Sequence, residues 1–168
     1  MIAMQLIDVG SFMTKLLRSE IFDSFLFMEG EIQTNISYSF DGHINKDFYS
    51  TEELEETQFS DLEYLPFSNL RNTLFELIKG KRTPTYFKFI FCLTPEATDS
   101  LLQPLGDSSH SGNIKSLIFR LTFQNRQLTC TTGVSYRNFC TDKTPEHEWD
   151  SFLCNFLKQY EIPYTVIS

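Results

Sequence analysis

Hydrophobic or β-branched side chains alternate with Gln, Asn and Ser over residues 32–40. An alternation of period two predicts a strand with one buried and one solvated face, which is typical of antiparallel sheets. The pair Asp41-Gly42 follows directly. Because Asp-Gly accepts the positive φ angles of a tight hairpin turn, it predicts a returning strand over residues 43–49.

A second group of predicted strands is rich in phenylalanine. Residues 85–93 carry three Phe and a Leu on one side and a single charged residue on the other, so we expect a central strand. Residues 117–123 and 128–136 alternate on either side of a turn at Asn125-Arg126, which predicts a second hairpin. Shorter strands are predicted over residues 3–7, 25–29 and 162–167.

Apolar residues recur every three or four positions in three further segments, which predicts amphipathic helices, and a Thr-Pro pair starts a fourth helix. Asp8 or Ser11 is available to cap the first helix, and Thr144 to cap the last. The last helix has the longest apolar stripe and contains the only Trp, Trp149. The four predicted helices span residues 10–18, 66–79, 95–105 and 145–160.

These elements predict an α+β fold, in which a mostly antiparallel sheet is covered by about four helices. Residues 50–63 are acidic and polar, and Ser50 and Glu53 have the spacing of a capping box, so we expect a solvated connection that begins with a helical turn. No linker-like or repetitive segment interrupts the pattern. We therefore expect one domain spanning residues 1–168.

Composition narrows the class of protein. The net charge is −8, which disfavours binding to nucleic acid or to an anionic membrane, and the 17 Phe residues predict a wide aromatic core. No apolar run is long enough for a membrane helix, and the first residues do not have the pattern of a signal peptide. The cysteines form no CxxC pair, so we expect free thiols and a cytoplasmic location; they are Cys92, Cys130, Cys140 and Cys154.

Candidate chemistry is sparse. His43, His110 and His147 are read as solvated or capping residues, because the sequence does not show whether carboxylates lie near them. Residues 79–83 superficially match a phosphate loop, but they follow the end of a helix and lack the first glycine of the motif. We expect no catalytic residue, metal site or cofactor. Asp41, Asp47 and Glu29 are left open as candidates for an acid pair across neighbouring strands, because the sequence does not give their separation.

Three stretches carry a resemblance to a known family. They are LFELIKGKRTPTYFKF, LTCTTGVSYRNF and the closing TPEHEWD. Together they resemble a family of small uncharacterised proteins from gut Clostridia, a domain of unknown function. The resemblance covers nearly the whole chain and implies no activity and no functional residues.

The order of strand, helix, three strands, helix and three strands also resembles a domain of the DNA sliding clamps. The resemblance is one of topology alone. It implies that helices face DNA and that cations on their polar sides form a basic face. The candidate residues are Lys15, Arg18, Arg71, Lys79, Lys81 and Arg82.

The sequence therefore leaves three functional hypotheses. The first is a non-enzymatic binding or accessory domain that contacts another protein or a small apolar ligand. The second is a clamp-like protein that meets nucleic acid only within an assembly. The third is an enzyme whose site is assembled from scattered residues, which a pocket joining His43 or His147 to a carboxylate would favour.

Overall fold

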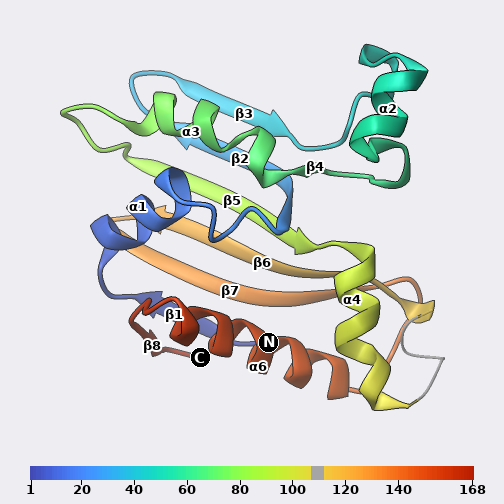
Figure 1. Cartoon of the computed structure of the whole chain (residues 1–168). Coiled ribbons are helices and arrows are strands. Elements are labelled where there is room, and N and C mark those ends of the chain that lie inside the picture. The colour runs from blue at the N-terminus through green and yellow to red at the C-terminus, as the bar shows by residue number, and fades with distance from the viewer. Residues whose placement is uncertain (107–111) are drawn as a thin grey trace.

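The strands pair into one antiparallel sheet. The computed structural model describes residues 1–106 and 112–168, and within them eight strands follow the order β3-β2-β5-β6-β7-β1-β8, with the short β4 also paired to β2 (Figure 1). Every strand pairing in this part of the chain is antiparallel. The strands are β1 (Ala3–Leu6), β2 (Phe25–Gln33), β3 (Ser37–Asp41), β4 (Leu65–Pro66), β5 (Tyr86–Leu93), β6 (Ile114–Gln124), β7 (Gln127–Tyr136) and β8 (Tyr164–Val166).

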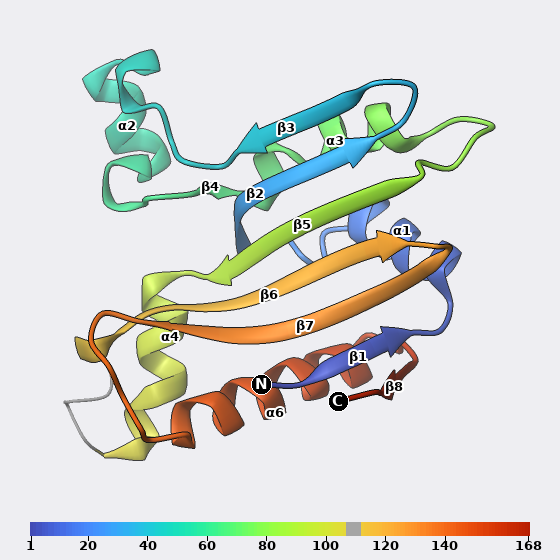
Figure 2. The same cartoon turned by 180° about the vertical axis from the view of Figure 1, so that it is seen from behind.

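Helices cover one face of this sheet. Three of the helices, α1, α3 and α6, lie against the same face, α4 lies at one end of it, and α2 projects from a corner beside β3 and β4 (Figures 1 and 2). Seen from behind, the strands lie in front of these three helices (Figure 2). The predicted α+β class is thus confirmed. The helices of the described ranges are α1 (Val9–Arg18), α2 (Thr51–Thr57), α3 (Arg71–Ile78), α4 (Pro95–Leu102) and α6 (Thr144–Gln159).

The aromatic residues form the core between the sheet and the helices. Phe91 stacks on Phe119 across β5 and β6 with 4.9 Å between ring centroids, and Phe87 stacks on Phe123 at 5.1 Å. Trp149 of α6 is fully buried, and its indole N–H donates to the backbone carbonyl of Ile118 at 2.8 Å. The predicted aromatic core is confirmed, because these rings face the helices and not solvent.

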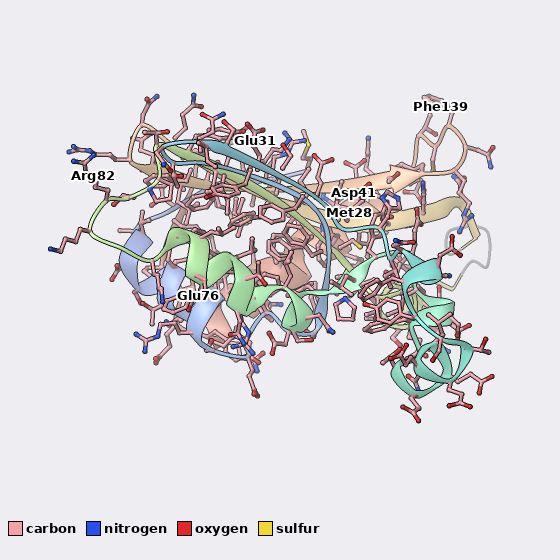
Figure 3. The ribbon with its side chains drawn as sticks, turned by 90° about the horizontal axis from the view of Figure 1, so that it is seen from above. Met28, Glu31, Asp41, Glu76, Arg82 and Phe139 are labelled. Carbon is pink, nitrogen blue, oxygen red and sulfur yellow. The ribbon has the colours of Figure 1, made fainter. Side chains whose placement is uncertain are left out.

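The opposite face of the sheet is largely polar. Register pairs there join Glu31 to Lys88 and Thr122 to Thr129, and Glu31 stands out from this face in an edge-on view (Figure 3). At one end Leu26 and Cys92 lie on this face beneath Tyr64 and form a second, smaller hydrophobic cluster. The alternation predicted for antiparallel strands is therefore present, with one local exception.

The first hairpin turn lies earlier than predicted. β2 continues to Gln33, and the chain turns over residues 34–36, where the Thr34 amide donates to the Ile36 carbonyl at 2.9 Å. The single strand predicted over residues 32–40 is therefore wrong: the segment holds the end of β2 and the whole of β3. Because alternation of side chains continues through the turn, periodicity alone does not reveal the break.

Asp41-Gly42 is not a hairpin turn. Gly42 has no positive φ; a Cβ there would lie 1.9 Å from the carbonyl oxygen of Phe27, beside a bulge at Met28. Residues 43–49, all within the described part, form an isolated bridge from His43 and a 3₁₀ turn in place of the predicted returning strand. Glycine is thus needed for close approach of two backbones, which looks the same in a sequence as glycine needed for a turn.

Two helix boundaries also differ from prediction. The helix predicted over residues 66–79 begins only at Arg71, because Pro66 is extended in β4 and a 3₁₀ turn follows it. At the start of α6 the Asp142 carboxylate accepts from the Thr144 amide at 2.9 Å and from its hydroxyl at 2.7 Å, so Thr144 is the first helical residue and not the cap. The caps predicted at Asp8 and Ser50 are confirmed.

The sliding-clamp comparison stays a prediction. The clamp-like order requires three consecutive strands after the second helix, whereas α4 lies between β5 and β6 and α6 lies between β7 and β8.

Candidate functional site

A large, partly open cavity lies where four distant segments meet. It has a volume of about 940 Å³ and is lined by the start of α1, the end of α3, the loop over residues 79–85 and the turn between β6 and β7. The interior is mainly apolar, and its hydrophobic residues are Val9, Met13, Ile78, Pro84 and Phe123. A volume of this size lies within the range of ligand pockets, which hold roughly 300–1,000 Å³.

Three of the residues that line this cavity are exposed cations, and we call the part that they line its mouth. Lys79, Arg82 and Arg126 are exposed and line it, and Arg82 projects outward at the far end of the loop (Figure 3). Among the described residues that line the cavity, none is Asp or Glu. We call this cavity, defined by its five hydrophobic residues and these three cations, the arginine-rimmed pocket.

The six cations predicted as a basic face do not form one free surface. Lys15 donates to the backbone carbonyls of Tyr160 and Glu161 at 2.8 and 3.0 Å, beyond the end of α6. Arg71 is largely buried and forms a two-pronged ion pair with Asp23, with both N–O distances 3.0 Å. Two of the six are therefore engaged within the fold.

The other four lie around the end of α3. Arg18 and Lys79 both lie over the ring of Phe75, at 5.6 Å and 5.8 Å from its centre. Lys79 also pairs with Glu76 at 2.6 Å. Within the described ranges Lys81 and Arg82 make no ion pair. The predicted cations thus yield one small group of free charges, at the loop over residues 79–85.

A second polar cluster lies on the open face of the sheet. The Asp41 carboxylate accepts from the His43 amide at 2.9 Å and lies 2.6 Å from its Nδ1, while His43 Nε2 lies 3.4 Å from the Glu63 carboxylate. The backbone hydrogen bond from His43 lowers the pKa of Asp41, and the hydrogen bond to Asp41 raises the pKa of His43. The sequence did not show this arrangement, because Glu63 is 20 residues away from His43.

The neighbours of this cluster are not activated. Burial raises the pKa of Tyr64 to about 12 and that of Cys92 to about 12, so both groups are protonated at neutral pH. The adjoining cavity of about 400 Å³ is lined by Met28, His43 and Ile90 among others, and Met28 and Asp41 lie close together (Figure 3). Both ring nitrogens of His43 face carboxylates, Nδ1 at 2.6 Å from Asp41 and Nε2 at 3.4 Å from Glu63, so neither points to an open position.

The remaining candidate residues do not add a site. His147 is exposed in the first turn of α6, and His110 lies outside the described residues. Glu29 is paired in register with Asp41, as the sequence allowed, but its carboxylate lies 3.2 Å from the Lys88 ammonium group. In residues 1–106 and 112–168 there is no group of three His, Cys, Asp or Glu side chains placed to hold a metal ion.

Of the helices that the structure describes, none combines the length and apolarity needed to cross a bilayer.

Sequence reasoning missed most of the arginine-rimmed pocket. In the sequence, Val9, Met13 and Phe123 belong to the apolar sides of predicted elements, and Arg126 belongs to a predicted turn. One signal was present: the turn reads Asn-Arg, where Asn-Gly is the favoured pair for a two-residue hairpin. Arg126 has a φ of 61°, a conformation that is uncommon for residues with a side chain.

Comparison with known proteins gives a family but no activity. The sequence model of a family of unknown function (DUF5721) matches residues 15–165, and the chain belongs to this family. No curated protein matches the chain, and no solved structure matches it.

Proposed function

For this member of a family of unknown function, we propose a non-enzymatic binding domain whose small ligand occupies the arginine-rimmed pocket. One observation carries the proposal: a cavity of about 940 Å³ with an apolar interior and a cationic mouth. Ligand pockets are mostly apolar and have a small number of polar groups that fix orientation. The pocket has this character, with Lys79, Arg82 and Arg126 as its charged groups.

Two alternatives have less support. An enzyme would be expected to use the cluster around His43, but there the imidazole is bound on both sides and the nearest thiol and phenol have raised pKa values. A nucleic-acid partner would be expected to use the helix cations, yet Lys15 and Arg71 are engaged within the fold. In the described residues, the histidine cluster therefore has no unengaged ring nitrogen, and two of the four helix cations are not available to phosphate groups.

Blocking the pocket tests the proposal. Gly10 lies at the wall of the pocket in the first turn of α1, and the nearest heavy atom to an added Cβ is 3.9 Å away, on Asp8. Gly10→Phe therefore adds a ring at the pocket wall without a backbone clash. Gly10→Ala is the matched control, because it changes helix propensity in the same direction and leaves the cavity open.

The probe is N-phenyl-1-naphthylamine, a neutral dye that fluoresces in apolar surroundings. We expect saturable binding to the wild-type chain and to Gly10→Ala, and loss of binding in Gly10→Phe. Thermal melts of all three proteins should show equal or higher stability for both variants, by up to about 1 kcal/mol. Equal binding by the folded Gly10→Phe variant would show that the dye lies elsewhere and would refute the proposed pocket.

A further inference from the structure

Two of the three cations that line the arginine-rimmed pocket have no carboxylate partner in the described part of the chain. Lys79 is paired with Glu76 at 2.6 Å. Arg82 and Arg126 are exposed and make no ion pair within the described part of the chain. Two guanidinium groups are thus available to a ligand, although the whole chain has a net charge of −8.

The cations that line the pocket are more exposed than its apolar residues. Pro84 and Phe123 are buried in its wall, and Val9, Met13 and Ile78 are half-buried there, whereas the three cations are exposed. A ligand that satisfies both regions must have an apolar body and a charged group at one end. The charge must be negative, because the described lining has no acidic side chain.

Arg126 occupies a backbone position that does not favour arginine. Asn125 and Arg126, between β6 and β7, have φ angles of 52° and 61°. In a two-residue hairpin with positive φ at both central positions, glycine is the favoured second residue. Backbone strain is often kept where a side chain has a role, and Arg126 is one of the residues that line the pocket.

We propose that the ligand is a small amphipathic anion, whose charged group lies between Arg82 and Arg126 and whose apolar body fills the interior. This inference rests on the proposed function, since it assumes that the pocket binds a ligand. Guanidinium groups bind carboxylate, phosphate and sulfonate oxygens through paired charge-assisted hydrogen bonds. The shared chemistry of the ligand is therefore an anionic oxygen group on an aromatic or aliphatic body.

Two dyes with the same ring system separate the charge from the apolar body. 8-Anilinonaphthalene-1-sulfonate carries an anionic group, and N-phenyl-1-naphthylamine is its neutral counterpart. Arg82→Gln/Arg126→Gly removes both free cations at the mouth. Arg120→Gln/Arg137→Gln is the matched control, because it removes two exposed cations that do not line the pocket.

We expect the mouth variant to bind the sulfonate dye about ten-fold more weakly at low salt, as the loss of charge-assisted hydrogen bonds implies. Its affinity for the neutral dye should change less than about two-fold, and the control variant should bind both dyes as the wild type does. Arg126→Gly alone should weaken binding of the sulfonate dye while raising the melting temperature, because glycine relieves the turn. This combination excludes misfolding as the cause of weaker binding.

The contrary results are distinct. If the mouth and control variants lose affinity for the sulfonate dye equally, or if neither loses any, the inference that the ligand is an anion is wrong. The proposed pocket still stands in that case, provided that Gly10→Phe blocks binding of the neutral dye. Binding of neither dye to the wild-type chain, or binding that Gly10→Phe does not affect, would overturn the proposed function itself.

Discussion

Substituting Gly42 tests the part of the fold that the sequence described wrongly. Gly42 follows β3 and lies against the bulge in β2, where its amide donates to the Met28 carbonyl at 2.8 Å. Its own carbonyl accepts from the Leu65 amide at 2.9 Å, which holds β4 in line with β3. The substitution Gly42→Ala would place a Cβ 1.9 Å from the carbonyl oxygen of Phe27 and 2.8 Å from that of Met28.

The size of the effect follows from these distances. Carbon and carbonyl oxygen atoms ordinarily approach no closer than about 3.3 Å, so the backbone at Gly42 must withdraw by roughly 1.4 Å. A displacement of this size breaks both hydrogen bonds of Gly42, each of which contributes about 1 kcal/mol net. Loosening of Tyr64, which is 8% exposed over the small cluster, adds to this loss. We expect Gly42→Ala to lower the free energy of unfolding by about 2–4 kcal/mol.

Urea denaturation followed by Trp149 fluorescence measures the global effect. Amide hydrogen exchange at Gly42 and Leu65 measures local detachment of residues 42–66, in case this segment opens before the sheet. Gly10→Ala is the control, because its Cβ meets nothing closer than 3.9 Å. Gly42→Asn separates two explanations for the glycine. If the glycine were needed for a positive φ in a turn, Asn would be tolerated, because Asn adopts positive φ readily. If it is needed because no Cβ fits, Asn and Ala should both destabilise the protein. Tolerance of Asn, or a loss below about 0.5 kcal/mol for Ala, would refute the steric reasoning.

Two further predictions concern the core and the cluster on the open face. Trp149→Ala should lower the free energy of unfolding by about 3–5 kcal/mol in a denaturant melt, because the ring is fully buried. Phe139→Ala is the control, since this residue is 93% exposed, and it should change the free energy of unfolding by no more than about 0.5 kcal/mol. Similar losses for both variants would place Trp149 outside the core. Because the pKa of His43 is raised on folding, its contribution to stability is complete below about pH 6.5 and is lost as pH rises through the folded pKa. An NMR titration should find this pKa above its usual value in the wild type and nearer to it in Asp41→Asn; an unchanged value in that variant would mean that Asp41 is not the cause. Since both side chains of the His43 pair are more than half exposed, the associated change in stability should stay below about 1 kcal/mol.

Local patterns predicted those elements whose boundaries are set locally. The β6–β7 hairpin, the cap of α1 at Asp8 and the capping box of α2 at Ser50 all follow from residues within a few positions of one another. The prediction of the first hairpin was wrong because Thr34 and Ile36 continue the alternation while forming the turn. The prediction at Gly42 was wrong because a residue without a side chain is required there by Phe27, which lies 15 residues earlier in the chain. A pattern of neighbouring residues contains no such information.

The candidate site was harder to predict for the same reason. Its wall takes Val9 from α1, Ile78 from α3 and Phe123 from β6, and each of these satisfies the ordinary rule that an apolar residue faces the core. Only their meeting at one end of the sheet leaves a cavity between them. The sequence shows Lys79 and Arg82 as cations, but it does not show which apolar residues lie beside them. Arg126, in a position suited to glycine, was the one local departure from expectation that pointed to the site.

The net charge of the chain and the local charge of the pocket act over different distances, and this difference determines how an acidic chain can bind an anion. The total of −8 repels an anion at long range, while Arg82 and Arg126 attract it at the mouth of the pocket. At 0.1 M salt the screening length is about 10 Å, so distant carboxylates are screened more strongly than a guanidinium in direct contact. Raising the salt concentration from very low values should therefore first increase the association rate of an anionic ligand. Only at higher salt concentrations should the affinity of the ligand fall. A simple cationic surface would show a steady decline instead, so the shape of the salt dependence separates a local anion site from a general basic face.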